Sequence, residues 1–365
     1  MRCRIAPKLN MYHSSPTLND DGKLEIHEGD QIEKYTVGNC IGRGTYGKVI
    51  KVFDIKNQVL ALKMIRIFED CPEEDVNREL NMLYEVELNK SRSINGNLIM
   101  MPITNLIYKQ HVCIVYPLMG SNLNDCIHHK NFLYFPNRTL NHIAKQTVKA
   151  LEFLHSIGIT HGDIKPDNIV FEDPKLYLKL NKSYDDFIAY CEFPSIKLID
   201  LGIARREGED NMVVISALPC RAPEVILEQG YQNVSDIWSL ASSLFMIWTG
   251  IVVFRGSTLL EQLLLYTTVL GPAPQKMVYY NTRYYVNGEI DIRQYFQTRN
   301  LRDAKVIYGK TMRNNLVLKL KDYRGKGGRQ NQLLTELLAR MFEWDPTDRI
   351  TATQVLLEPY FSNVS

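Results

Sequence analysis

The chain has 365 residues, 45% of them hydrophobic and 23% charged, which is enough apolar material for a large core and excludes wholesale disorder. Its 43 lysines and arginines nearly balance 41 aspartates and glutamates, which argues against a dedicated, sequence-independent nucleic-acid binder. The longest apolar stretch, Leu244 to Phe254, is shorter than the roughly 20 residues that span a bilayer, so no membrane association is expected.

Cysteine and histidine usage points to a reducing compartment. The seven cysteines form no CxxC pair, so neither a disulfide framework nor a zinc module is supported. The adjacent His128 and His129 have no cysteine or HExxH partner, and we interpret them as part of a solvated loop or helix end. The N-terminus carries no apolar run typical of a signal sequence. We therefore expect an intracellular protein, in the cytoplasm, the nucleus or both.

The first third of the chain is rich in strand signals. Residues 1–30 mix Pro, Ser, Asn, Asp and Gly without a period and are predicted to be a flexible tail. From Tyr35, short β-rich runs at residues 35–41, 47–54 and 59–65 predict consecutive antiparallel strands. Residues 72–88 carry apolar side chains at helical spacing, and two more strands follow at 105–109 and 111–118. The helix positions are Val76, Leu80, Leu83 and either Val86 or Leu88.

After Gly120 the pattern becomes helical. Residues 139–158 place Ile143, Thr147, Val148, Leu151 and Leu154 on one face, and residues 236–248 are apolar nearly all round, as in a buried central helix. Two further amphipathic helices are predicted at 258–270 and 332–342. The fold class is therefore α+β: a small antiparallel β-rich lobe over about 35–119, a larger helical lobe over about 120–361, and a cleft between them.

A glycine cluster joins the first two strands. Gly42, Gly44 and Gly47 form a GxGxxG pattern, but a strand follows it, whereas a Rossmann dinucleotide site requires a helix. The segment is either a flap whose glycines let its backbone approach nucleotide phosphates or a structural hairpin.

Lys63 is the second candidate for a functional residue, because it interrupts an apolar strand and buried lysines need a partner. Glu79, 16 residues further on in the predicted helix, is a suitable one. Lys63 would then hold nucleotide phosphates, and the alternative is a surface lysine on an edge strand.

The densest polar segment runs from His161 to Asn168, HGDIKPDN, and contains a possible base, a cation and a metal-binding amide. Asp200-Leu201-Gly202 follows an apolar strand, and Ala222-Pro223-Glu224 lies further downstream.

In this order the motifs resemble those of the eukaryotic protein kinases, over residues 35–361. The resemblance implies the bilobal kinase fold, with ATP and Mg²⁺ in the cleft. It implies that Lys63 holds the α- and β-phosphates, that Glu79 holds Lys63, and that Asn168 and Asp200 bind Mg²⁺. Asp163 would accept the proton of the substrate hydroxyl and Lys165 would neutralise the transferred phosphoryl group.

The resemblance also implies a set of ATP contacts and a set of structural residues. Tyr116 would stand at the back of the adenine pocket, where the lobes join. The expected ATP contacts are Ile41, Gly42, Gly44, Gly47, Val49, Ala61, Lys63, Tyr116, Pro117, Met119 and Val170. The expected structural and activation-segment residues are Gly202, Ser216, Arg221, Glu224, Asp236 and Arg349, with Arg349 paired to Glu224.

Within the family the chain is similar to the CMGC group, through Arg221, the sequence Arg78-Glu79-Leu80 and the long insert at about 271–330. Its nearest branch is that of the SR-protein and LAMMER kinases, and residues 173–193 fall where SR-protein kinases carry a spacer. By analogy, this branch implies a monomer acting on protein substrates, with Arg-Ser-rich proteins as the candidate class.

Three departures from the family pattern are visible. Gly162 replaces the arginine that grips an activation-loop phosphate, and Ser216 is the single hydroxyl residue between Asp200 and Glu224. We therefore expect activity without activation-loop phosphorylation. Ala217 lacks a hydroxyl that usually supports the catalytic aspartate, a loss of about 1–3 kcal/mol, and Pro219-Cys220 replaces an aromatic pair.

Two interpretations of the activation segment and three hypotheses about the function remain open. Arg205 and Arg206 either bind an anion or belong to a solvated mixed-charge loop. The chain is an active Ser/Thr kinase, or alternatively a catalytically weak pseudokinase or scaffold. A third hypothesis, nucleic-acid binding through the basic residues at 321–329, competes with a solvated loop, and no direct nucleic-acid partner is expected.

Overall fold

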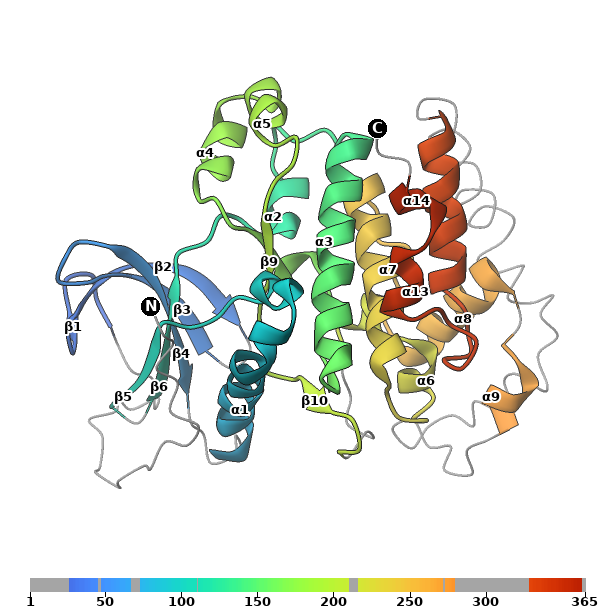
Figure 1. Ribbon diagram of the computed structural model, residues 1–365, viewed down its shortest axis with the longest axis horizontal. Helices are drawn as coiled ribbons and strands as arrows, with labels where there is room; N and C mark the ends of the chain where they lie inside the picture. The colour runs from blue at the N-terminus through green and yellow to red at the C-terminus, as the bar shows by residue number, and fades with distance from the viewer. Residues whose placement is uncertain are drawn as a thin grey trace.

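The computed structural model describes residues 26–44, 47–66, 73–109, 111–209, 216–271, 273–279 and 328–362. Two lobes are visible in Figure 1, a β-sheet with one long helix on the left and a mainly helical lobe on the right. This is the α+β bilobal arrangement predicted from the sequence. Most of the predicted tail (1–30) and of the predicted insert (271–330) lies outside the described residues.

The small lobe is built on one antiparallel sheet with the strand order β1-β2-β3-β4-β6-β5. The strands form in runs rich in β-branched, aliphatic and aromatic residues, and β2 with β3 and β3 with β4 are antiparallel neighbours. Their bounds are β1 Gln31–Ile32, β2 Tyr35–Gly44, β3 Gly47–Phe53, β4 Val59–Arg66, β5 Thr104–Tyr108 and β6 His111–Pro117.

The alternation in β4 determines where Lys63 lies. Leu62 and Met64 pack in a core on one side of the sheet, whereas Ala61 and Ile65 belong to the main core on the other side. Because successive strand residues face opposite sides, Lys63 shares the face of Ala61 and Ile65. That face looks toward α1 (Glu73–Asn89) and the large lobe.

Helix α1 buries the predicted stripe against the sheet. Leu80, Leu83 and Val86 are buried, whereas Leu88 is 54% exposed, so Val86 is the residue that continues the stripe. Glu79 is 3% exposed on the same helix. The short 3₁₀ turns η1 (Lys90–Arg92) and η2 (Ile94–Leu98) connect α1 to β5.

Two long helices lie side by side in the centre of the large lobe, α3 (Asn137–Ser156) and α7 (Asn233–Thr249). All five residues predicted for the apolar face of α3 are buried, and α7 is buried over nearly its whole length. The chain leaves α7 at Gly250, whose φ of 70° is the left-handed conformation that ends helices at glycine.

The other helices surround this pair. They are α2 Leu123–Ile127, α4 Lys175–Lys182, α5 Tyr184–Tyr190, η4 Leu218–Cys220, α6 Pro223–Ile226, α8 Leu259–Leu270, α9 Gln275–Tyr279, the helical residues 328–341, α13 Ala352–Leu356 and α14 Pro359–Ser362. No helix in the described ranges is both long and apolar enough to cross a membrane.

The predicted spacer at 173–193 forms the paired helices α4 and α5. They lie beside α2 at the top of the molecule in Figure 1. Phe187 of α5 is fully buried among aromatic rings of the large lobe, 6.0 Å from Phe135 and 6.3 Å from Phe171 between ring centroids. The spacer is therefore part of the lobe core rather than a loose extension.

Two small antiparallel sheets position the polar segments. Strand β7 (Ile159–Thr160) pairs with β10 (Arg205–Arg206), and β8 (Ile169–Phe171) pairs with β9 (Ile196–Leu198). The HGDIKPDN segment, including the 3₁₀ turn η3 (Pro166–Asn168), lies between β7 and β8, and Asp200 follows β9. Both segments are thereby brought to the cleft.

Candidate active site

A cavity of about 590 Å³ lies between the lobes. Nine of the eleven expected ATP contacts line it: Ile41, Gly42, Val49, Ala61, Lys63, Tyr116, Pro117, Met119 and Val170. Glu79 and Asp200 line it as well. Gly44 and Gly47 instead face each other as the last β2–β3 pair, beyond the cavity lining.

The cavity is also lined by residues that the sequence analysis did not predict. Met100 and Ile199 add apolar surface, and Asp125 and Asp167 add two carboxylates. Ile199 could have been found, because it immediately precedes Asp200. Met100 and Asp125 lie in segments without a motif, and only the packing of the lobes brings them to the cavity.

The glycine at position 47 is required by the close approach of two strands. A Cβ there would lie 2.0 Å from the carbonyl oxygen of Met64, closer than any real contact. The glycine-rich segment is therefore a tightly packed hairpin that also borders the cavity through Gly42.

Lys63 is held between two carboxylates. Its Nζ lies 2.9 Å from both oxygens of Glu79 and 2.8 Å from Oδ1 of Asp200. Burial alone would lower the pKa of Lys63, but the charges of Glu79 and Asp200 raise it, so the ammonium stays protonated. Partial burial would raise the pKa of Asp200, but the charge of Lys63 lowers it.

Tyr116 and Gly202 complete this polar centre. The hydroxyl of Tyr116, expected at the back of the pocket, donates to Glu79 Oε1 at 3.2 Å. The backbone N–H of Gly202 donates to Asp200 Oδ1 at 3.3 Å. A Cβ at position 202 would lie 3.1 Å from that same oxygen, so a larger residue there would displace the Asp200 carboxylate by a few tenths of an ångström.

The HGDIKPDN segment places three functional groups together. Lys165 Nζ lies 2.7 Å from Asp163 Oδ2, and Asn168 Nδ2 donates to the same oxygen at 3.0 Å. Burial would lower the pKa of Lys165, but the hydrogen bond and charge of Asp163 raise it. The carboxylate of Asp163 is thus held by two donors, with the ammonium beside it.

The donor set at Asn168 and Asp200 suits a hard cation. Asn168 Nδ2 also donates to the Asp163 carbonyl at 2.8 Å, and since both of its partners are acceptors, the nitrogen faces them and Oδ1 faces away. Lys63 and Gly202 both donate to Oδ1 of Asp200, which leaves its Oδ2. Two oxygens of this kind are what Mg²⁺ prefers. No cluster of three or more His, Cys, Asp or Glu suited to a metal occurs in the described residues.

Asp236 of α7 anchors the start of the HGDIKPDN segment. Its buried carboxylate accepts the backbone N–H of His161 at 2.8 Å and of Gly162 at 2.9 Å, and it lies 2.9 Å from His155 Nε2. These contacts tie the start of the segment to α7.

Glu224 and Arg349 form the ion pair that the resemblance implied. The two nitrogen–oxygen distances are 2.7 and 2.8 Å, and both side chains are almost fully buried. Ser235 donates to Glu224 at 2.7 Å, and the guanidinium lies over the ring of Trp238. The fork geometry and the extra donors make this a structural link between α6, α7 and the segment before α13.

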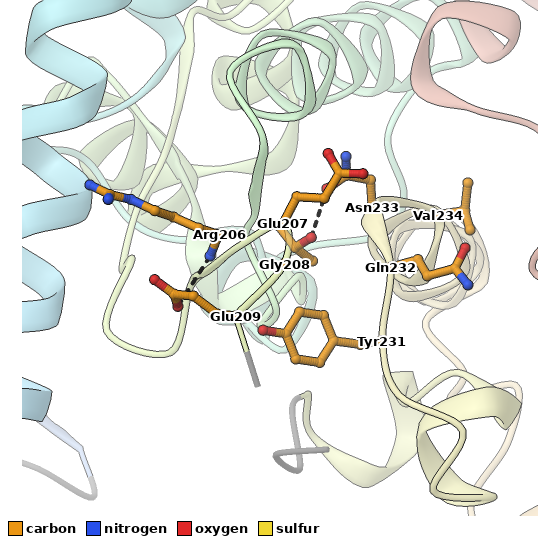
Figure 2. Close-up of a pocket in the computed structure, with 9 residues that line it drawn as sticks. Arg206, Glu207, Gly208, Glu209, Tyr231, Gln232, Asn233 and Val234 are labelled. Carbon is orange, nitrogen blue, oxygen red and sulfur yellow. Dashed lines mark hydrogen bonds between the residues drawn. The ribbon is translucent and has the colours of Figure 1, made fainter. Parts of the chain in front are cut away.

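The two arginines of β10 have partners within the protein. Arg206 pairs with Glu85 of α1 at 2.6 Å, and Arg205 is buried and donates to the carbonyls of Ile203 and Ala204. Figure 2 shows Arg206 and Glu209 beside a second cavity of about 590 Å³. Arg205 is therefore buried within the lobe, whereas Arg206, whose side chain is 45% exposed, belongs to a mixed-charge surface segment.

Ser216 is 9% exposed, and its hydroxyl donates to the carbonyl of Gly162 at 2.8 Å. Arg221 donates to the carbonyl of Ser216 at 2.8 and 3.2 Å. The hydroxyl and the carbonyl of Ser216 thus both have hydrogen-bond partners within the large lobe.

Comparisons with known proteins agree with this geometry. A sequence model of the protein kinase domain matches residues 35–361. The dual specificity protein kinase CLK2 of Mus musculus is 30% identical over 95% of this chain and 68% of its own length. The serine/threonine-protein kinase Doa of Drosophila melanogaster is 28% identical over 96% of this chain and 42% of its own. For the serine/threonine-protein kinase AFC2 of Arabidopsis thaliana the figures are 28%, 96% and 82%.

The chain therefore belongs to the protein kinase family. Its relatives lie in the LAMMER branch of the CMGC group, as the sequence predicted, and the protein is an enzyme that phosphorylates proteins with ATP. The alternative of a pseudokinase scaffold finds no support in these comparisons.

Proposed function

We propose that this kinase uses Asp163 as the catalytic base, Lys165 to neutralise the transferred phosphoryl group, and Lys63 to hold the α- and β-phosphates. The observation that carries the proposal is the double fixation of Asp163 by Lys165 at 2.7 Å and Asn168 at 3.0 Å. A carboxylate held in this way accepts a proton in one defined direction.

The chemistry follows from this arrangement. The substrate hydroxyl lies against Asp163 and loses its proton to that carboxylate as its oxygen attacks the γ-phosphorus, and the bond from that phosphorus to the β-phosphate oxygen breaks. Lys165 supplies positive charge next to the reacting groups. Lys63, kept protonated by Glu79 and Asp200, orients the phosphates of ATP.

We assign the divalent cation as Mg²⁺, held by Asn168 Oδ1 and Asp200 Oδ2. When bound, Mg²⁺ would neutralise charge on the β- and γ-phosphates. Support comes from the orientation of the Asn168 amide, whose nitrogen is committed to Asp163.

We further propose that the acceptors are serine or threonine hydroxyls in arginine-rich segments. Asp125 and Asp167 line the cleft together; Asp125 Oδ2 accepts from Asn122 Nδ2 at 3.0 Å, and the charge of Asp167 acts on Lys165. Burial raises the pKa of Asp125, and the charge of Asp167 raises it further. An arginine near both carboxylates would relieve their repulsion through charged hydrogen bonds.

The test is transfer of phosphate from labelled ATP, with Mg²⁺, to an Arg-Ser-repeat peptide, a Ser-Pro peptide and a tyrosine version of the first. We expect transfer to the Arg-Ser serines and its loss in Asp163→Asn. Transfer to the tyrosine peptide at a similar rate would show that the enzyme is a dual-specificity kinase rather than a Ser/Thr kinase.

Variants separate substrate recognition from chemistry. Asp125→Asn and Asp167→Asn should raise KM for the Arg-Ser peptide about tenfold each, the effect of about 1.4 kcal/mol, with little change for the Ser-Pro peptide. Glu192→Gln, an exposed carboxylate paired with Arg138 in the same lobe, is the matched control and should change neither KM. An unchanged KM in both Asp variants contradicts the arginine proposal.

A further inference from the structure

The peptide unit between Gly162 and Asp163 is held at both ends. Its carbonyl oxygen accepts the Ser216 hydroxyl at 2.8 Å, and its N–H, that of Asp163, donates to His161 Nδ1 at 3.2 Å. Since a peptide unit is planar, fixing its oxygen and its nitrogen fixes the plane from which Cα of Asp163 extends. The orientation of the Asp163 side chain therefore depends on Ser216, which is 54 residues away from Gly162.

Ser216 adopts a conformation that its sequence neighbours do not explain. Its φ is 68°, the left-handed region that costs a non-glycine residue about 1–2 kcal/mol. Arg221 holds this conformation by donating twice to the Ser216 carbonyl. The next residue, Ala217, has no hydroxyl to offer. A strained, buried serine whose hydroxyl meets the residue before Asp163 points to a role in the site.

Helix α7 supports the same segment from the other side. Ser239 Oγ lies 3.3 Å from Ser216 Oγ and donates to the Cys220 carbonyl at 2.7 Å. Each hydroxyl carries one proton, and the shorter bonds to the carbonyls use both. Ser216 thus connects to the catalytic segment, while Ser239 connects the chain around Ser216 to α7.

We propose that Ser216 is a positioning residue that orients Asp163 through the Gly162–Asp163 peptide unit. This inference rests on the role proposed above for Asp163. Removing the hydroxyl frees the carbonyl end of the unit, so Asp163 samples orientations that do not reach the substrate hydroxyl. Ser216 does not line the ATP cavity, and the affinity for ATP is therefore independent of it.

The test compares Ser216→Gly and Ser216→Ala in the full chain. Both remove the hydroxyl, but glycine also relieves the backbone strain, so its melting temperature should equal or exceed that of the wild type. We expect both variants to lower the single-turnover rate of phosphoryl transfer about tenfold or more, with KM for ATP unchanged. A lower rate in a protein that is no less stable cannot come from damage to the fold.

Ser242→Ala is the matched control. Ser242 is a buried serine on α7, the helix that also carries Ser239, and its hydroxyl has no hydrogen-bond partner in the described part of the chain. It should keep the wild-type rate, and Ser239→Ala should lose less activity than the Ser216 variants.

Wild-type rates in both Ser216 variants would overturn the inference, and so would rate losses that follow the melting temperature across all four variants. Asp163→Asn is measured in parallel. A full rate in Asp163→Asn contradicts the role of Asp163 itself, whereas full rates in the Ser216 variants alone contradict only the positioning role.

Discussion

Lys63 Nζ contacts Asp200 Oδ1 at 2.8 Å across 137 residues of sequence, and the same ammonium contacts both oxygens of Glu79. The contact joins β4, α1 and the residue after β9, and therefore links the two lobes. It places the groups that we propose for phosphate and metal binding around one charge.

Replacing Lys63 tests this arrangement. Lys63→Met should lower phosphoryl transfer at least about a hundredfold, because the phosphates lose their positioning charge. It should also lower the free energy of unfolding, by up to about 3–5 kcal/mol, because Glu79 stays buried without its cation. The measurements are steady-state kinetics and urea unfolding. An active Lys63→Met enzyme contradicts the role assigned to the lysine.

The Glu224–Arg349 pair should matter for stability more than any surface ion pair. Glu224→Gln leaves a buried guanidinium without its counter-charge, so we expect the free energy of unfolding to fall by about 3–5 kcal/mol. Arg138→Gln breaks an exposed pair with Glu192 and should change it by less than about 1 kcal/mol. Equal decreases in the free energy of unfolding for Glu224→Gln and Arg138→Gln, measured in urea, would show that burial of the ion pair does not increase its contribution to stability.

Phosphatase treatment should leave the activity unchanged. Ser216 is the single hydroxyl residue between Asp200 and Glu224, and it is buried with its hydroxyl on Gly162. A phosphate there would have to break that bond and enter a closed site. Mass spectrometry before and after treatment, together with the kinase assay, checks this. Loss of activity together with loss of a Ser216 phosphate would contradict the expectation.

The Arg206–Glu85 pair should make a small contribution to activity. It joins the activation segment to α1, which carries Glu79, and both side chains are partly exposed. Glu85→Gln should therefore slow the enzyme about twofold to fivefold, the effect of about 0.5–1 kcal/mol. The charge-reversed double variant Glu85→Arg with Arg206→Glu should recover the loss. If the double variant is slower than either single one, the pair does not act as proposed.

Recognition of arginine-rich peptides should weaken in mild acid. Burial and the charge of Asp167 raise the pKa of Asp125, so its carboxylate takes up a proton at a higher pH than an ordinary aspartate. KM for the Arg-Ser peptide should consequently rise as pH falls toward that pKa. In Asp125→Asn, KM should be higher but less dependent on pH. Identical pH profiles for the two proteins would exclude Asp125 as the titrating group.

The local features of this protein can be predicted from its amino-acid sequence. Apolar periodicity predicted α1 and α3, because side chains about 3.6 residues apart share one face. Runs of β-forming residues predicted the strands, and a segment that is apolar nearly all round predicted α7. The order of motifs identified the family, since each motif can be recognised within a short segment of the sequence. Even the choice between Val86 and Leu88, however, needed the packed structure.

Contacts between distant groups could be seen only in the folded chain. Arg206 of β10 meets Glu85 of α1, Ser216 meets Gly162, and Asp125 of α2 approaches Asp167 of η3 because the packing of the elements brings these segments together. The period of a helix or strand reports which of its faces is apolar, but not which distant residue its polar face will meet. Hydrogen bonds and ion pairs act over a few ångströms, so the packing of the apolar faces must first place the loops before such contacts can form.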